Sequence, residues 1–471
     1  MENKKYDLVV LGAGPGGYVA AIRASQLGLK TAIVEKRKTL GGTCLNVGCI
    51  PTKALLDSTE KYYKIREKMA VHGIQISEAE VDVKKLADRK NKIVSEVCQG
   101  VEFLMKKNKI DVYTGTGKIL EKGRVEVSLA ENLPEKTVLN CDNIIIATGS
   151  VPIDIPILPI DGKTIITSDH AVDLKEVPER LAIIGAGVIG LELGSVYARL
   201  GAEVTVIEML PRLFMPVDKQ IAAFMQRSLE AQGFKFHFNQ KLISCEKNNN
   251  ELKLISETKD GTKNEIAADC ALVAVGRKPY IENSGIEDIG VKLNERGRII
   301  VNEETYETDA KGVYAIGDVI EGLMLAHKAE EEGIAVAEVI AKKPAHVNYA
   351  AIPSVVYTSP EIAWVGVSEE QCKEKGVEVN TGTFLFRANA RAKAMEEAEG
   401  MVKVIADKKT DRLLGVFIAG PHASELIAEA AVAFEFSASS EDIARSIHAH
   451  PTLSEALKEA AMAASKWSIH S

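Results

Sequence analysis

The sequence lacks a long apolar run and a long block of positive charge. A membrane-spanning helix needs about 20 consecutive apolar residues, and a secretion signal needs an apolar segment near the amino terminus. Neither is present, and the first residues lead directly into a strand pattern. Acidic residues number 66 against 58 lysines and arginines, a formal net charge of −8. Because nucleic-acid binding depends on clustered positive charge, the composition predicts neither a nucleic-acid nor a membrane partner.

Cysteine is also scarce, with seven residues in a chain of 471. Their odd number and scattered positions do not form the disulfide framework of small secreted domains. We therefore expect a reducing compartment, namely the cytoplasm of a bacterial-type cell, with a mature organellar form as the alternative. In such a compartment a close cysteine pair is expected to be catalytic rather than structural.

The size and composition predict a globular protein of several domains. At roughly 150 residues per domain, 471 residues correspond to about three domains. Hydrophobic residues make up 46% and charged residues 26%, so large cores can form and disorder is not expected.

One pair of cysteines, Cys44 and Cys49, lies within the glycine-containing stretch 41–53. On an ideal helix, residues five apart have Cα atoms roughly 8.6 Å apart. A disulfide needs about 4.4–6.8 Å, so paired cysteines would exclude a regular helix between them. We expect Gly48 to adopt an unusual backbone angle and Pro51 to begin the regular part of the next helix.

Three interpretations of this pair are possible from spacing alone. The thiols could be two small buried hydrophobic groups, or they could bind a metal together with further ligands. The nearest other candidate ligands, His72 and Cys98, do not form a ligand-like cluster, so we predict no metal site. The third interpretation is a redox-active dithiol that opens and closes, and the neighbouring motifs favour it.

A nucleotide-binding pattern precedes the cysteine pair. The buried strand 6–11 leads into a glycine turn formed by Gly12, Gly14 and Gly17, and a helical pattern follows as far as Leu27. A second buried strand, 31–34, ends on Glu35. The glycines allow close approach of a pyrophosphate, the helix start offers amide donors, and the acid can bind a ribose hydroxyl. This sequence predicts dinucleotide binding.

The same pattern occurs a second time. Strand 181–184 leads to Gly185, Gly187 and Gly190, a helix runs to residue 200, and strand 204–207 is followed by Glu208. In both copies the acid lies 23 positions after the first glycine. Two copies predict two bound dinucleotides. Since Glu208 would repel a 2′-phosphate and no arginine cluster follows it, we expect NAD rather than NADP at the second site.

The remaining segments can be assigned only coarsely. We expect charged helices over 52–110, short strands over 111–150, and a similar strand and turn over 271–279. Asp318 follows a strand and could bind sugar or ribityl hydroxyls, or could be an ordinary turn residue. After residue 350 we expect strands and turns, including a hairpin over 401–420, and then helices to the end.

Two histidines near the carboxyl end are candidates for a general base. His450 has Glu455 five positions later, and we expect Pro451 to begin the next helix. A histidine oriented by a carboxylate is a suitable proton acceptor. His448 competes with it, and the spacing does not separate the two.

Taken together, these motifs resemble the FAD-dependent pyridine nucleotide–disulfide oxidoreductases over essentially the whole chain. The resemblance is carried by GGTCLNVGCIPTK, the two GAGxxG turns, ATGS, YAIGDV, MLAH, PSVVYTSPE and HAHPTLSEA. It implies an α/β fold with two Rossmann-like dinucleotide-binding domains, for FAD and NAD, and a C-terminal α+β dimerisation domain. The implied boundaries are 1–150 for the first part of the FAD domain, 151–279 for the NAD domain, 280–349 for the central part, and 350–471 for the dimerisation domain.

The resemblance also assigns roles to individual residues. Cys49 would be the thiol nearest the flavin, Cys44 would exchange with substrate, and His450 with Glu455 would be the acid–base pair, supplied by the other subunit. The FAD residues would be Gly12, Gly14, Gly17, Glu35, Lys53, Gly117, Thr148, Gly149, Asp318, Met324, Leu325, Ala326 and His327. The NAD-side residues would be Gly185, Gly187, Gly190, Glu192, Glu208, Leu242 and Gly276, with Glu192 as the partner of Lys53.

The implied activity is that of the branch of the family that oxidises protein-bound dihydrolipoyl groups. The Cys44–Cys49 disulfide and FAD would take up the electrons and pass a hydride to NAD+. The partners would be a second copy of the chain and lipoyl-bearing proteins of 2-oxo acid dehydrogenase complexes or of the glycine cleavage system. The alternatives are an NAD(P)H-dependent disulfide reductase similar to glutathione reductase, and a flavoprotein retained only as a binding module.

Overall fold

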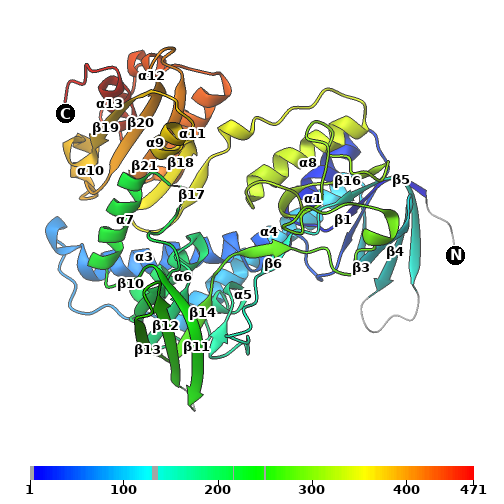
Figure 1. The fold of residues 1–471 in the computed structure, drawn as a ribbon, viewed down its shortest axis with the longest axis horizontal. Coiled ribbons are helices and arrows are strands. Elements are labelled where there is room, and N and C mark those ends of the chain that lie inside the picture. Colours follow the sequence, from blue (N-terminus) through cyan, green and yellow to red (C-terminus); the bar gives the residue numbers. More distant parts are fainter. Residues whose placement is uncertain (1–4, 130–135, 216, 249–250, 471) are drawn as a thin grey trace. The chain divides into compact units, whose positions relative to one another are not determined.

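The computed structural model describes residues 5–129, 136–215, 217–248 and 251–470. The chain divides into two compact units. The first comprises residues 1–55, 84–153 and 276–347, and the second comprises 56–83, 154–275 and 348–471 (Figure 1). Among the described residues there is no helix that combines the length and the apolar character needed to span a bilayer.

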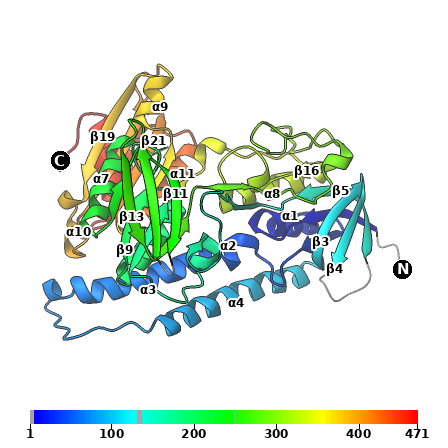
Figure 2. The ribbon, with the colours of Figure 1, turned by 60° about the horizontal axis from the view of Figure 1, so that its bottom comes forward.

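The first unit is built on a parallel sheet. Its parallel strands lie in the order β3 (Asp111–Glu121), β2 (Thr31–Glu35), β1 (Lys5–Leu11), β5 (Thr137–Ile146), β16 (Val313–Ala315). Strand β4 (Arg124–Leu129) pairs antiparallel with both β3 and β5, and Figure 2 shows β3 and β4 as a hairpin. All five residues of β2 are buried, as expected for a parallel strand covered on both faces.

Helices α1 (Pro15–Gln26) and α8 (Ala326–Ile340) pack directly against each other in this unit (Figure 1). Glycines allow the close approach, because a Cβ atom on Gly333 would lie 2.5 Å from the carbonyl oxygen of Gly16. The other elements are α2 (Gly42–Asn46), α4 (Val83–Lys107), the antiparallel pair β6 (Ser150–Pro152) and β15 (Arg277–Pro279), and the 3-10 helices η2 (Glu287–Ile289) and η3 (Gly317–Val319). Helix α3 (Cys49–Glu67) begins in the first unit and ends in the second.

The second unit contains another parallel sheet, in the order β10 (Lys235–His237), β9 (Glu203–Ile207), β8 (Arg180–Ile184), β14 (Cys270–Val273), β7 (Ile165–Ile166). Its helices are α5 (Ser168–Ala171), α6 (Val188–Arg199) and α7 (Lys219–Ala231), and η1 (Ala70–His72) follows α3. A three-stranded antiparallel sheet accompanies it, formed by β11 (Gln240–Asn248), β12 (Glu251–Thr258) and β13 (Lys263–Ala268).

The C-terminal part of the second unit is an antiparallel sheet with helices. The strands lie in the order β17 (Ser354–Val356), β18 (Glu361–Gly366), β21 (Leu413–Gly420), β20 (Met401–Asp407), β19 (Val379–Leu385). Around it lie η4 (Tyr349–Ala351), α9 (Glu369–Glu374), η5 (Phe386–Ala388), α10 (Ala390–Ala394), α11 (Ala423–Glu435), α12 (Ser440–Arg445) and α13 (Glu455–Ala464). The predicted α/β fold with a C-terminal α+β part is confirmed, whereas the four boundaries stay a prediction.

Three local predictions were wrong. Helix α3 begins at Cys49 rather than at Pro51, and proline is tolerated there because the first-turn amides have no acceptor within the helix. Helix α13 begins at Glu455, not at Pro451. Gly48 does not have a positive φ angle. Its lack of a side chain matters because a Cβ atom there would lie 3.0 Å from the carbonyl oxygen of Thr43.

Candidate active site

The first glycine turn is held by steric fit and by one carboxylate. A Cβ atom on Gly12 would lie 2.4 Å from the carbonyl oxygen of Ala147, and one on Gly17 would lie 1.9 Å from the oxygen of Gly12. Glu35, at the end of β2, accepts a 2.8 Å hydrogen bond from Ala13 N and a 2.9 Å bond from Arg37 N. The acid predicted to bind a ribose thus also fixes the turn.

The second turn repeats this arrangement. Glu208 accepts a 2.7 Å hydrogen bond from Ala186 N and a 2.8 Å bond from Leu210 N. A Cβ atom on Gly185 would lie 2.6 Å from the carbonyl oxygen of Ala274, whereas the space beside Gly187 is open for 4 Å. The two glycine turns therefore share the same contacts to their acids as well as the same spacing.

The helix starts behind these turns suit anionic ligands. Helices α1 and α6 begin after Gly14 and Gly187, and neither has a side-chain cap or an acidic residue in its first turn. Helix α8 begins in the same way after Leu325. Free amide groups and the positive end of the helix dipole can bind a pyrophosphate. The residues therefore fit the dinucleotides that the sequence predicts.

The cysteine loop is attached to the first glycine turn. Gly41 N donates a 2.8 Å hydrogen bond to the carbonyl oxygen of Ala13. Both Gly41 and Gly42 have positive φ angles, 97° and 58°, and a Cβ atom on Gly42 would lie 2.5 Å from the Cα of Gly14. The backbone of the cysteine loop thus lies against the glycine turn that is predicted to bind the pyrophosphate.

The two thiols lie within hydrogen-bond reach of each other. Cys44 is half-buried and Cys49 is exposed. The hydrogen bond to Cys49 and then burial raise the pKa of Cys44, with a smaller increase from the charge of Glu330, whereas Lys53 lowers it. Helix α2 ends at Asn46, and Val47 has non-helical backbone angles, φ −139° and ψ 9°. The non-helical break between the cysteines is therefore present, as predicted.

A polar network surrounds the predicted ribityl contact, Asp318. The hydroxyl of Ser150 donates to Asp318 and accepts a 2.8 Å bond from Arg277 Nε. The backbone next to Asp318 is tied to α8, because Gly317 N donates a 2.8 Å hydrogen bond to Glu332. Glu332 also forms a buried ion pair with Lys328 on the same helix, at 2.8 Å. Asp318 is thus bound directly by Ser150, while Arg277 and α8 hold the neighbouring groups Ser150 and Gly317.

The other predicted FAD residues all belong to the first unit. Thr148 donates its hydroxyl proton to the carbonyl oxygen of Tyr280, whose N–H binds the oxygen of Gly149 at 2.8 Å. Gly117 lies against the core, because a Cβ atom there would be 2.8 Å from Leu11. Lys53 lies on α3, and Met324 to His327 span the start of α8. Their FAD contacts stay predictions.

The predicted NAD-side residues belong to the second unit except Gly276, which the first unit contains. Glu192 is 2% exposed and accepts a 2.9 Å hydrogen bond from Tyr357 N. Leu242 is buried in the core of this unit with Leu252 and Leu254. Their roles toward NAD or Lys53 stay predictions.

The structure separates the two histidines. The His450 ring is 73% exposed, and its Nδ1 lies 2.9 Å from Glu455. The second oxygen of Glu455 accepts a 2.9 Å bond from Thr452 N. Burial alone would raise the pKa of Glu455, but these two hydrogen bonds outweigh it and the pKa is lowered. His448 is 7% exposed and binds Glu429 at 2.7 Å. His450 is the accessible base with an oriented ring.

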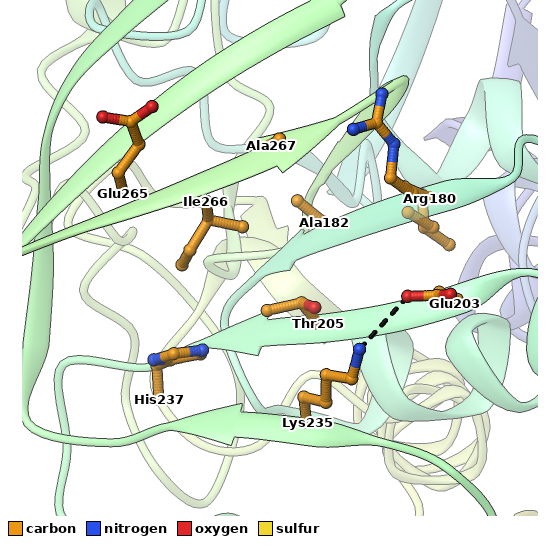
Figure 3. Close-up of a pocket in the computed structure, with 10 residues that line it drawn as sticks. Arg180, Ala182, Glu203, Thr205, Lys235, His237, Glu265, Ile266 and Ala267 are labelled. Carbon is orange, nitrogen blue, oxygen red and sulfur yellow. Dashed lines mark hydrogen bonds and ion pairs between the residues drawn. The ribbon is translucent and has the colours of Figure 1, made fainter.

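A cavity of about 210 Å³ lies elsewhere in the second unit (Figure 3). It is lined by Arg180 and Ala182 of β8, Glu203 and Thr205 of β9, Lys235 and His237 of β10, and residues 265–267 of β13. The lining includes both starts and ends of strands, because Glu203 begins β9 whereas His237 ends β10 and its carbonyl oxygen accepts a 2.9 Å hydrogen bond from Glu208 N. Two of the lining side chains, Lys235 and Glu203, form an ion pair at 3.1 Å. Among the described residues no cluster of three or more His, Cys, Asp or Glu could hold a metal ion.

Sequence reasoning missed several supporting residues. Asn46, between the two cysteines, makes four side-chain hydrogen bonds. Lys328 and Glu332 could have been found from their helical i, i+4 spacing. Ser150 lies in the ATGS motif, but its contact with Asp318 joins residues 168 positions apart and left no signal in the sequence.

Comparison with known proteins gives a consistent result. Residues 6–333 match the family described as pyridine nucleotide-disulphide oxidoreductase, and residues 352–461 match its dimerisation domain. The chain is 50% identical over 465 residues to the mitochondrial dihydrolipoyl dehydrogenase of Pisum sativum, covering 98% of this chain and 92% of the relative. It is 51% identical over 458 residues to the leghemoglobin reductase of Glycine max, covering 97% and 87%.

A solved structure extends this similarity to the fold. The copper(II) complex of the HOCl-induced flavoprotein disulfide reductase RclA from Escherichia coli superposes with a TM-score of 0.86 at 27% identity. The match covers 97% of this chain and 99% of that one.

Proposed function

Since the chain belongs to the pyridine nucleotide-disulphide oxidoreductase family, we propose that it acts as a dihydrolipoyl dehydrogenase, using FAD and NAD+. The observation that carries the proposal is the hydrogen-bonded Cys44–Cys49 pair, attached through Gly41 to the first dinucleotide turn. Relatives at about 50% identity over nearly the whole chain, named for this activity, support it.

The reaction begins with thiol–disulfide exchange. A dihydrolipoyl thiolate attacks the Cys44 sulfur of the oxidised pair, forming a mixed disulfide and releasing Cys49 as a thiolate. The second dihydrolipoyl thiolate then attacks the lipoyl sulfur of the mixed disulfide. The lipoyl ring closes and Cys44 leaves as a thiolate. Two electrons have then moved from the substrate to the cysteine pair.

His450 accepts the protons that the substrate thiols release. With Nδ1–H donated to Glu455, the Nε2 atom keeps its lone pair and lies on an exposed ring. Lys53 favours the thiolate of Cys44 by its positive charge. Bound FAD would supply the two-electron redox chemistry that links the dithiol to NAD+. Glu208 favours the free 2′-hydroxyl of NAD+ over a 2′-phosphate.

We also propose a homodimer in which His450 and Glu455 serve the cysteine pair of the other subunit. The dimerisation-domain match over residues 352–461 supports the dimer. Large exposed apolar side chains in this region, Val432, Phe436 and Ile447, give further support. The substrate proteins would be lipoyl-bearing components of a 2-oxo acid dehydrogenase complex or of the glycine cleavage system. A cytoplasmic location stays a prediction.

The test is NADH formation from NAD+ and dihydrolipoamide by purified, flavin-loaded protein. We expect turnover by the wild type and its loss in Cys44→Ser, with the flavin still bound, because serine cannot form the mixed disulfide. Cys245→Ser is the matched control, since Cys245 lies on β11 in the second unit.

Normal turnover by Cys44→Ser would contradict the proposed chemistry. Reduction of glutathione disulfide by NADPH, without oxidation of dihydrolipoamide, would instead favour the glutathione reductase-like alternative.

A further inference from the structure

The side chain of Asn46, between the two cysteines, uses its full hydrogen-bonding capacity. Its Nδ2 donates to the carbonyl oxygens of Leu40, at 3.0 Å, and Gly42, at 2.8 Å. Its Oδ1 accepts from the hydroxyl of Thr39 at 2.6 Å and from the thiol of Cys98 at 3.5 Å. A carboxamide has two N–H donors and two lone pairs, so none is left unused.

These bonds connect the two ends of helix α2, which lies just before the non-helical break between the two cysteines. Leu40 and Gly42 lie before or at the start of α2, and Asn46 is its last residue. Helix α2 has only five residues, too few to be stable from its own backbone bonds. The Asn46 side chain therefore fixes the segment that carries Cys44.

The fourth bond connects this segment to a distant helix. Cys98 lies on α4 and is 2% exposed. Burial, and to a smaller extent the charge of Glu102, raise the pKa of Cys98, so that it stays protonated and can donate. Its sulfur donates to a residue 52 positions earlier in the chain. Helix α4 packs on the core of the first unit through Cys98, Val101 and Met105, so it offers a fixed support.

We propose that Asn46, supported by Thr39 and Cys98, is a positioning residue that holds Cys44 beside Cys49 and thereby sets the equilibrium between the dithiol and the disulfide. This inference rests on the proposed function. A fixed segment loses less conformational freedom when the sulfur–sulfur bond closes. Oxidation of the Cys44–Cys49 dithiol releases two electrons and two protons. A small-molecule disulfide, oxidised dithiothreitol, can accept them and become a dithiol.

The test measures that equilibrium directly. Flavin-loaded protein is equilibrated in buffers of oxidised and reduced dithiothreitol, quenched by alkylation, and the oxidised fraction of Cys44 and Cys49 is read by mass spectrometry. Asn46→Ala removes all four bonds without adding charge. Asn46→Asp keeps both acceptor contacts but loses both donors and adds a negative charge near the thiols.

We expect both variants to lower the ratio of disulfide to dithiol about tenfold, which corresponds to about 1.4 kcal/mol. Asn46→Asp should also slow alkylation of Cys44 at a given pH, because the added charge opposes thiolate formation. Asn108→Asp is the matched control: Asn108 follows the end of α4 and donates to Leu104 O, so the same change should leave the ratio unaltered.

Variants of Cys98 provide an independent test if an Asn46 variant does not fold. Cys98→Ala removes the donor to Asn46, whereas Cys98→Ser keeps one. We expect the alanine variant to lower the ratio a few-fold, since a thiol is a weak donor, and the serine variant to lie closer to the wild type. Melting temperature and flavin content report any general loss of structure.

The proposal would be overturned if the Asn46 variants that fold kept a disulfide-to-dithiol ratio within about twofold of the wild type. If neither folds, the same result for Cys98→Ala would overturn it. An equal change in Asn108→Asp would overturn it as well. The measurement needs no lipoyl substrate. Failure of the wild type to oxidise dihydrolipoamide would therefore contradict the proposed function while the role of Asn46 could still be decided.

Discussion

Two histidines near the carboxyl end, only two positions apart, have opposite environments. His448 is buried and paired with Glu429, while His450 is exposed and held through one nitrogen by Glu455. The hydrogen bond that His448 donates to Glu429 raises the pKa of His448, although burial acts in the opposite direction. One histidine thus contributes to stability, and the other is available for proton transfer.

This assignment predicts how stability depends on pH. Because the folded pKa of His448 is raised, the folded state binds its proton more tightly than the unfolded chain does. The contribution is complete below about pH 6.5, the pKa of an unperturbed histidine, and is lost as pH rises through the folded pKa. The free energy of unfolding, measured by urea titration across this range, should therefore fall with pH. His448→Gln should flatten that fall, and an unchanged profile would contradict the assignment.

Pairs of elements are fitted together by glycine rather than by large side chains. Helices α1 and α8 approach through Gly16 and Gly333, and a Cβ atom on Gly16 would lie 2.8 Å from the carbonyl oxygen of Ala329. Both helix starts contribute predicted FAD residues. The separation of the two helices therefore also fixes the two ends of that site.

A matched pair of glycine substitutions tests this packing. Gly333→Ala should destabilise the protein by about 1–3 kcal/mol, because the new Cβ atom overlaps the backbone of α1. Gly100→Ala, on α4, meets no atom within 4 Å and should stabilise by about 0.5–1 kcal/mol through helix propensity. Urea unfolding measures both. Equal effects of the two substitutions would show that the contact does not limit the approach of the helices.

The whole molecule has large apolar side chains that a single chain leaves exposed. Phe436 is 81% exposed and Ile447 is 98% exposed, both in the part that matches the dimerisation domain. Burying one Phe side chain contributes about 1.5–3 kcal/mol. Such residues are expected at the interface between two copies of the chain.

Phe436→Asp should therefore raise the dimer dissociation constant by roughly 10–100-fold, which sedimentation velocity over a concentration series measures. Under conditions where the variant is monomeric, flavin should remain bound while dihydrolipoamide oxidation is lost, because His450 would be missing from each site. Ile300→Asp, at a 46% exposed position outside the dimerisation match, is the control. Full activity in a monomer would contradict the proposal that His450 acts across subunits.

The sequence alone determined the strands, turns and helices of the two dinucleotide-binding patterns and assigned the rest only coarsely. Apolar runs, the glycine turns and the acids at fixed spacing predicted both dinucleotide-binding patterns, because strands, helices and tight turns depend on local sterics and periodicity. The break between Cys44 and Cys49 followed from the same reasoning. Helix starts near Pro51 and Pro451 were misplaced by two to four residues, since proline restricts a first turn without fixing where it begins.

Only the tertiary structure decided which side chains are buried and which are paired. It separated His448 from His450, although both lie in one short segment, because Glu429 lies 19 positions away from His448 in the sequence. It brought Cys98 to Asn46 across 52 positions and Ser150 to Asp318 across 168. Such contacts depend on how distant segments pack, and local spacing does not encode them. The chemistry of this protein can therefore be predicted from its motifs, whereas the support that positions it becomes visible only in the folded chain.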